Sequence, residues 1–245
     1  MNHRNTRILL LQIREQQDPM LIQERHAFAA ALGKSLDSIL PLDLIYDELT
    51  PAHLREVDLV MIGGSGDYSV TAEADWLYRA LDSIRFLYES KKPTFASCWG
   101  FQAVSRALGG TVVTDLSRAE VGSIPTRLTE AGRRDPLFGG CPDEFYSYLG
   151  HQDIVTQLPP QAELLASTEK VRNQALRFPD RIFYATQFHP ELSRAALLQR
   201  VNAYPQYVEK ITGQSFEEFE STLSDAPEMA GLLRRFVQMV DEIVS

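Results

Sequence analysis

The chain has 245 residues, of which 44% are hydrophobic and 23% charged, which suits one large α/β domain. Its formal net charge of −9 argues against nucleic acid or an anionic membrane surface as a main partner, because no basic face is available. Two cysteines are too few for a disulfide framework, and no stretch approaches the ~20 apolar residues of a membrane span. We therefore expect a soluble, cytoplasmic protein.

Apolar runs of strand length alternate with helical patterns in the first part of the chain. Asp18 and Pro19 suit the start of the first helix, and Gly33 suits its end. This β-α-β-α order predicts an α/β fold with a mostly parallel open sheet and helices on both faces. The expected strands are 7–13, 42–46, 59–62 and 94–96, and the expected helical segments are 19–32, 51–56, 73–90 and 100–108.

The second part of the chain changes character. Short strand patterns at 111–114, 123–128, 145–149 and 181–188 have few helices between them, which predicts an antiparallel extension at the sheet edge. Helical patterns then follow at 193–201, 216–223 and 227–243. The apolar stripe of the last one would pack on the core or, alternatively, against a partner or a second copy. We expect one domain over 1–245, with a core of about 7–192 and a helical extension of 193–245.

Cys98 falls between a predicted buried strand and the helix that begins near Gly100. The free N–H groups of the first helical turn and the helix dipole favour a thiolate at this position. A buried, inert cysteine is the alternative. Cys141 lies in a loop beside Gly140 and Pro142 without such a setting, and we interpret it as structural.

His189 and Glu191 follow the predicted strand 181–188 and flank Pro190. Residues i and i+2 of an extended segment point to the same side, so both side chains can reach one place. His189 could take a proton from Cys98 while Glu191 sets its tautomer. The alternative is a loop histidine beside a surface glutamate. Both motifs end predicted parallel strands, where ligands bind in such sheets, and this favours function.

The glycine run 63–66 follows the strand 59–62. Successive glycines let backbone N–H groups converge on an anion. We predict that the N–H groups of Gly64 and Trp99 form an oxyanion hole. A plain tight turn or a phosphate loop are the alternatives, and the second lacks the Gly-x-x-x-x-Gly-Lys pattern. The Trp99 ring could cover the substrate or simply pack at the helix start.

The sequences GGSG at 63–66, CWGFQ at 98–102 and HPE at 189–191 occur in this order. Together they resemble the class I, or triad, glutamine amidotransferase domain, over about residues 7–192. The chain is most similar in type to stand-alone proteins that resemble the amidotransferase domain of GMP synthase.

The resemblance implies hydrolysis of the glutamine side-chain amide through a γ-glutamyl thioester, with release of ammonia. It makes Cys98 the nucleophile, His189 the base and Glu191 its orienting acid, while Gln102 would help to hold the amino-acid end of the substrate. No synthetase part is recognisable, so the ammonia acceptor would be a separate protein or water. No metal-ligand cluster or dinucleotide motif is present, and we expect no cofactor.

The motifs also depart from the family pattern. Ala96 stands where the family usually has glycine, and Ser65 where many members have proline. Weaker similarities lie at 120–122 and 150–153. Within the second of these, His151 could orient the site or gate the substrate, or it could be a hydrogen-bonded core histidine. Two other functions remain open: hydrolysis of γ-glutamyl peptides or conjugates by the same triad, and a catalytically weak regulatory or interaction protein.

Overall fold

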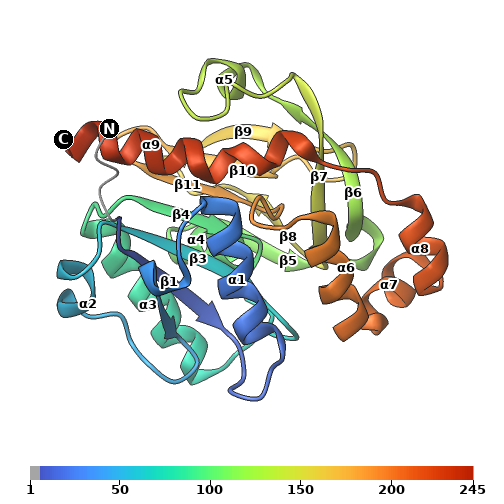
Figure 1. Ribbon diagram of the computed structural model, residues 1–245, viewed down its shortest axis with the longest axis horizontal. Helices are drawn as coiled ribbons and strands as arrows, with labels where there is room; N and C mark the ends of the chain where they lie inside the picture. The colour runs from blue at the N-terminus through green and yellow to red at the C-terminus, as the bar shows by residue number, and fades with distance from the viewer. Residues whose placement is uncertain (1–5, 245) are drawn as a thin grey trace.

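The computed structural model describes residues 6–244, and a nine-stranded mixed sheet forms the centre of this part of the chain (Figure 1). Five strands on one side are parallel to their neighbours, as the sequence predicts. Four further strands continue the sheet in antiparallel pairing, which confirms the edge extension. The order is β2 (Ile39–Asp43), β1 (Ile8–Ile13), β3 (Leu59–Ser65), β4 (Thr94–Ser97), β11 (Phe183–Thr186), β10 (Ala175–Phe178), β9 (Glu163–Ser167), β6 (Glu120–Leu128) and β7 (Glu144–His151).

Helices cover both faces of the sheet, and each face has its own buried apolar cluster. One cluster contains α1 (Met20–Leu32) and α9 (Leu232–Val244), and the other contains α3 (Asp75–Glu89) and α4 (Trp99–Ala107). The shorter helical elements are α2 (Pro51–Arg55), α5 (Glu130–Arg134), α6 (Arg194–Ala203), α7 (Pro205–Thr212), α8 (Phe216–Thr222), η1 (Leu36–Ser38), η2 (Leu116–Arg118) and η3 (Pro227–Gly231).

The long C-terminal helix α9 crosses the sheet, and its apolar stripe belongs to the core (Figure 1). Phe236 packs edge-on against Phe95 and Tyr184, with ring centroids 5.5 and 6.1 Å apart. Of the two alternatives for this stripe, core packing is therefore the one observed. The segment predicted as one helix over 227–243 begins as the short η3 turn before α9.

Three details of the predicted elements are wrong. The second strand is residues 39–43, not 42–46: Pro41 is tolerated because β2 lies at the sheet edge, and residues 44–47 form a turn closed by Asp43. The predicted strand 111–114 exists as β5 but pairs only with β8 (Asp153–Gln157), in a separate two-stranded sheet. Strand β3 continues through Gly63 and Gly64 to Ser65 instead of ending at Ile62.

The carboxyl ends of β3, β4 and β11 are neighbours in the sheet. Gly64 lies at the end of β3, Cys98 directly follows β4, and His189 follows β11 by three residues. The fold thus brings the three sequence motifs to one edge of the parallel sheet, where ligands bind in open α/β folds. Within residues 6–244, no helix has the length and apolar character that crossing a membrane requires.

Candidate active site

Cys98 occupies a strained turn between β4 and α4. Its backbone has φ 54° and ψ −108°, a conformation that residues with a side chain rarely adopt. The Cys98 N–H donates to the carbonyl of Thr186 at 2.8 Å, and its carbonyl accepts from the Gln102 N–H at 3.2 Å, so both neighbouring elements hold the turn. The thiol is 8% exposed and lines a cavity. This geometry presents the sulfur at the start of α4, as the sequence predicts.

The alanine at position 96 fits this turn because Gly100 follows it. A Cβ on Gly100 would lie 2.9 Å from the Ile62 side chain and 3.1 Å from the Ala96 methyl group. Glycine at 100 therefore leaves the space that the Ala96 side chain needs. The departure from the usual glycine at 96 does not prevent a tight strand–helix turn.

His189 and Glu191 form a buried pair beyond the end of β11. His189 Nδ1 and Glu191 Oε1 are 2.7 Å apart, and the His189 N–H donates to the Tyr148 carbonyl at 2.9 Å. Burial opposes the charge on His189, but Glu191 and the Cys98 sulfur outweigh it and raise the pKa of the imidazole. Burial likewise opposes the charge on Glu191, yet His189 and Arg200 lower the pKa of that carboxyl. An imidazolium next to a carboxylate is the favoured state of this pair.

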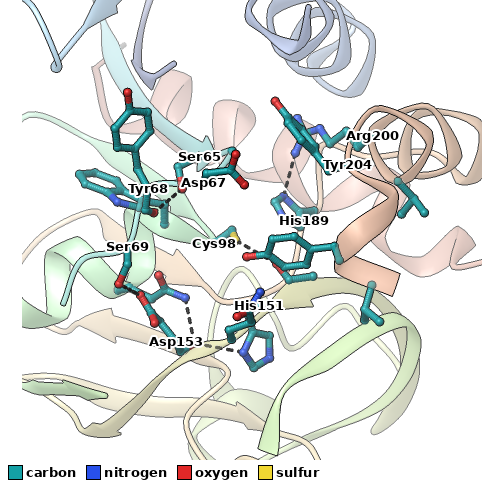
Figure 2. Close-up of a pocket in the computed structure, with 18 of the residues that line it drawn as sticks. Ser65, Asp67, Tyr68, Ser69, Cys98, His151, Asp153, His189, Arg200 and Tyr204 are labelled. Carbon is teal, nitrogen blue, oxygen red and sulfur yellow. Dashed lines mark hydrogen bonds between the residues drawn. The ribbon is translucent and has the colours of Figure 1, made fainter. Parts of the chain in front are cut away.

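The side chains of Cys98 and His189 converge next to Gly64 (Figure 2). A Cβ on Gly64 would lie 3.2 Å from His189 Cε1 and 3.7 Å from Cys98 Cβ, so any side chain at residue 64 would crowd both. The sulfur is also 3.8 Å from the Gly150 carbonyl oxygen. The cysteine, the imidazole and the carboxylate that the sequence places together are therefore assembled at one place.

The backbone groups predicted for the oxyanion hole have different surroundings. Trp99 is the first residue of α4, directly after the sulfur-bearing residue. Its ring is 1% exposed and stacks on Trp76 at 6.3 Å, which agrees with a packing role. The Gly64 N–H donates to Glu24 Oε1 at 3.1 Å. The role of Gly64 as an oxyanion donor remains a prediction, and it requires this hydrogen bond to open.

Arg200 is a functional candidate that sequence reasoning missed. From α6 it reaches the histidine–glutamate pair, with Nη1 at 3.3 Å from His189 Nδ1 and 3.4 Å from Glu191 Oε1. Its Nη2 lies 3.6 Å from Glu24 Oε1, and its Nε donates to Gln23 Oε1 at 3.1 Å. Arg200 is 8% exposed, so its charge is balanced by these carboxylates and not by solvent. No sequence signal separates this arginine from a solvated helix residue.

Gln102 and His151 both line the cavity, but other groups of the chain hold them. The Gln102 amide donates to the Asp153 carbonyl at 3.0 Å and to Gln187 Oε1 at 3.1 Å. His151 Nδ1 lies 3.1 Å from the Asp153 carbonyl, and Nε2 lies 3.2 Å from Glu120 Oε2. For His151 this is the geometry of a hydrogen-bonded core histidine. A role of Gln102 in holding substrate stays a prediction.

The cavity has a volume of about 280 Å³, near the lower end of small-molecule sites. One wall is the loop 65–69, and the opposite wall is formed by α6 and α7 through Arg200, Tyr204, Tyr207 and Lys210. Figure 2 shows Cys98 and His189 between these walls. Cys141 does not line the cavity. Within residues 6–244, no group of three or more His, Cys, Asp or Glu side chains is arranged to hold a metal ion.

Comparisons with known proteins agree with this geometry. The model of the family described as glutamine amidotransferase class-I matches residues 38–199. A glutamine-hydrolyzing GMP synthase of Lactobacillus delbrueckii subsp. bulgaricus is 34% identical over 149 residues, which are 60% of this chain and 28% of that protein. One subunit of a glutamine-hydrolyzing GMP synthase of Sulfolobus acidocaldarius is 31% identical over 139 residues, 57% of this chain and 70% of that protein.

Solved structures share the fold over nearly the full chain. A glutamine amidotransferase of Thermotoga maritima has a TM-score of 0.76 at 22% identity and covers 98% of this chain and 100% of its own. A glutamine amidotransferase of Methylobacillus flagellatus has a TM-score of 0.73 at 19% identity, with 98% and 94% covered. The chain spans less than a third of the length of the Lactobacillus GMP synthase that it matches. On the evidence of the family match, the chain belongs to the class I glutamine amidotransferases.

Proposed function

We propose that this chain hydrolyses the side-chain amide of glutamine through a γ-glutamyl thioester on Cys98. The observation that carries the proposal is the position of His189, held 2.7 Å from Glu191 on one side and directed at the Cys98 sulfur on the other. A nucleophile, a base and an orienting carboxylate in this order are the parts that acyl transfer needs.

The steps follow from the charges of these groups. The Cys98 thiolate attacks the amide carbon, and the N–H groups of Trp99 and Gly64 stabilise the resulting oxyanion. The His189 imidazolium gives its proton to the leaving nitrogen, ammonia departs, and a thioester remains. His189, now neutral, takes a proton from water, whose attack on the thioester releases glutamate and restores the thiolate. Glu191 keeps the imidazole oriented throughout.

We propose that the ammonia is used by a separate protein. Two relatives are named as single subunits of a GMP synthase, and in this respect the chain is similar to them. A synthase-type acceptor protein is therefore the partner class to search for, with water as the acceptor when no partner is present.

Two other functions are tested by the same assay. The triad could instead act on γ-glutamyl peptides or conjugates, in which an amine replaces ammonia as leaving group. The chain could also be a regulatory protein with weak catalysis. The cavity volume of about 280 Å³ favours a substrate as small as glutamine.

The experiment is product release from glutamine and from γ-glutamyl dipeptides, with the purified chain and with the Cys98→Ala variant. We expect ammonia and glutamate from glutamine, at a higher kcat/KM than for any dipeptide, and none with the variant. Higher kcat/KM on dipeptides would establish the conjugate hydrolase. Turnover that survives in Cys98→Ala would refute the thioester mechanism.

A further inference from the structure

The wall of the cavity formed by α7 lies outside the segment that the family model matches, which ends at residue 199. This helix begins at Pro205 and ends before Gly213, whose φ of 71° closes it. Tyr204, which precedes it, donates to Asp18 Oδ1 at 2.6 Å and accepts from Arg14 at 3.3 Å. The helix is therefore anchored at its start to the loop before α1, and its position over the cavity is defined by hydrogen bonds.

Lys210 reaches the cavity from the last turn of α7. Its Nζ donates to Gln152 Oε1 at 2.8 Å, two residues after the Gly150 carbonyl that lies 3.8 Å from the Cys98 sulfur. Among the described residues 6–244, no carboxylate lies within ion-pair distance of this ammonium group. In a chain with a net charge of −9, a cavity cation whose only hydrogen bond goes to a neutral amide is available to an anionic ligand group.

Asp67 faces α7 from the opposite wall, in the loop after β3 (Figure 2). Its charge acts on both Tyr204 and Tyr207, which places the carboxylate across the cavity from the helix. In the described part of the chain, this carboxylate forms no ion pair and its side chain has no hydrogen bond. The cavity thus has an unpaired anion on one wall and a cation without a carboxylate partner on the other.

The chemistry that matches this arrangement is an α-amino acid head, with one ammonium and one carboxylate on the same carbon. We propose that Lys210 binds the α-carboxylate and Asp67 the α-ammonium of the γ-glutamyl substrate, while its γ-carbonyl lies at Cys98. The helix α7 is then part of the substrate site and limits the substrates to γ-glutamyl groups with a free amino-acid head.

Tyr207 supports the assignment from the middle of the same helix. Burial raises the pKa of its hydroxyl, and the charges of Cys98, Asp153 and Asp67 act in the same direction. The hydroxyl is therefore a neutral donor beside Gln152 and can complete the hydrogen bonds of a bound carboxylate. Its neighbour Lys210 supplies the charge.

This inference rests on the proposed function, and two truncated substrates separate its parts. Glutaramate is glutamine without the α-ammonium group, and 4-aminobutanamide is glutamine without the α-carboxylate. We expect Lys210→Met to raise KM for glutamine and glutaramate by about tenfold, the effect of losing one charge-assisted hydrogen bond, with kcat unchanged. KM for 4-aminobutanamide should stay the same. Asp67→Asn should show the reverse pattern, and Lys210→Arg should restore most of the affinity.

The matched control is Lys92→Met. Lys92 also donates one hydrogen bond to a carbonyl oxygen, that of Val57 at 2.9 Å, but it precedes β4 and lies at the opposite end of that strand from Cys98. Asp37→Asn, in the η1 turn, serves as the control for Asp67. Both controls should keep the wild-type KM for all three substrates.

Three results would overturn the inference. The first is an equal KM for glutamine in Lys210→Met and Lys92→Met. The second is a loss on 4-aminobutanamide as large as that on glutaramate in Lys210→Met. The third is a loss in Lys210→Met that depends on a carboxylate in the leaving group, seen as a larger effect on γ-glutamylglycine than on γ-glutamylmethylamide.

A binding measurement separates this inference from the proposed reaction. L-glutamate should bind to Cys98→Ala by calorimetry, and about tenfold more weakly to the Cys98→Ala, Lys210→Met double variant. If the wild type turns over none of the substrates but this difference is found, the reaction fails and the amino-acid site stands. If the wild type is active and both proteins bind glutamate equally, only the site assignment fails.

Discussion

The Gly64 N–H donates a 3.1 Å hydrogen bond to Glu24, a carboxylate on α1 that is completely buried. The same carboxylate is 3.2 Å from Arg14 and 3.6 Å from Arg200, and Arg200 contacts both His189 and Glu191. One side chain thus connects the glycine loop to the histidine–glutamate pair. A rotation of the Gly64 peptide toward an oxyanion would break its bond to Glu24.

Glu24→Gln should destabilise the fold strongly. It keeps an oxygen for Gly64 but leaves Arg14 and Arg200 buried with too little negative charge, and breaking a buried ion pair costs about 3 kcal/mol of unfolding free energy. Urea denaturation measures this loss. Glu48→Gln, which removes an exposed ion pair with Arg79, is the control and should cost much less. Equal losses in the two variants would contradict the role given to the buried network.

Arg200→Met should lower kcat with little change in KM. The variant removes the cation that holds Glu191 in its ionised form, and the loss of one charge-assisted hydrogen bond, ~1.5 kcal/mol, corresponds to a fall of about tenfold. Because the pKa of Glu191 should rise without this cation, the acidic limb of the kcat profile should move to higher pH. Arg200→Lys should partly restore the limb. A rise in KM with an unchanged pH profile would show that Arg200 only shapes the cavity.

The backbone at Cys98 predicts an unusual order of stability among its variants. At φ 54° and ψ −108° alanine is strained just as cysteine is, whereas glycine adopts this conformation without cost. Cys98→Gly should therefore be more stable than Cys98→Ala by about 1 kcal/mol, although glycine loses more entropy on folding. Thermal unfolding of both variants measures the difference. A less stable glycine variant would mean that the turn is not strained.

The protonation of His189 can be observed by NMR titration of histidine-labelled protein. Its pKa should lie above the ordinary 6.5, because Glu191 and Cys98 outweigh the effect of burial. Cys98→Ala should lower this pKa, and Glu191→Gln should lower it further. Since the folded-state pKa is the higher one, the charged ring stabilises the fold fully below pH 6.5, and this contribution is lost as the pH rises through the folded-state value. A His189 pKa below 6.5 would contradict the charged pair.

The local sequence patterns contain the parallel half of the fold and the convergence of the motifs. Strand-length apolar runs are followed by glycine-rich or capped helix starts, so the sequence alone places Cys98, Gly64 and His189 at one sheet edge. Strands β8, β9 and β10 were not predicted, because each is only four or five residues long and depends on pairing partners distant in the chain.

The missed parts of the site have a different cause. Pro205 is typical of a break between elements, yet it is the first residue of α7, the helix that carries Tyr207 and Lys210. Glu24 and Arg200 lie in helices, where a charged residue usually faces solvent, and only the packing of α1 against α6 makes them partners. Buried pairing of this kind is a tertiary property that spacing along one chain does not encode.

The central claim is that Cys98 carries the acyl group. Peptide mass spectrometry of the chain, quenched in acid during turnover of glutamine, tests it most directly. The account predicts one γ-glutamyl adduct, on the peptide that contains Cys98, which disappears in Cys98→Ala and accumulates when Glu191→Gln slows its hydrolysis. An adduct on the peptide with Cys141, or steady turnover of glutamine with no adduct in either protein, would contradict it.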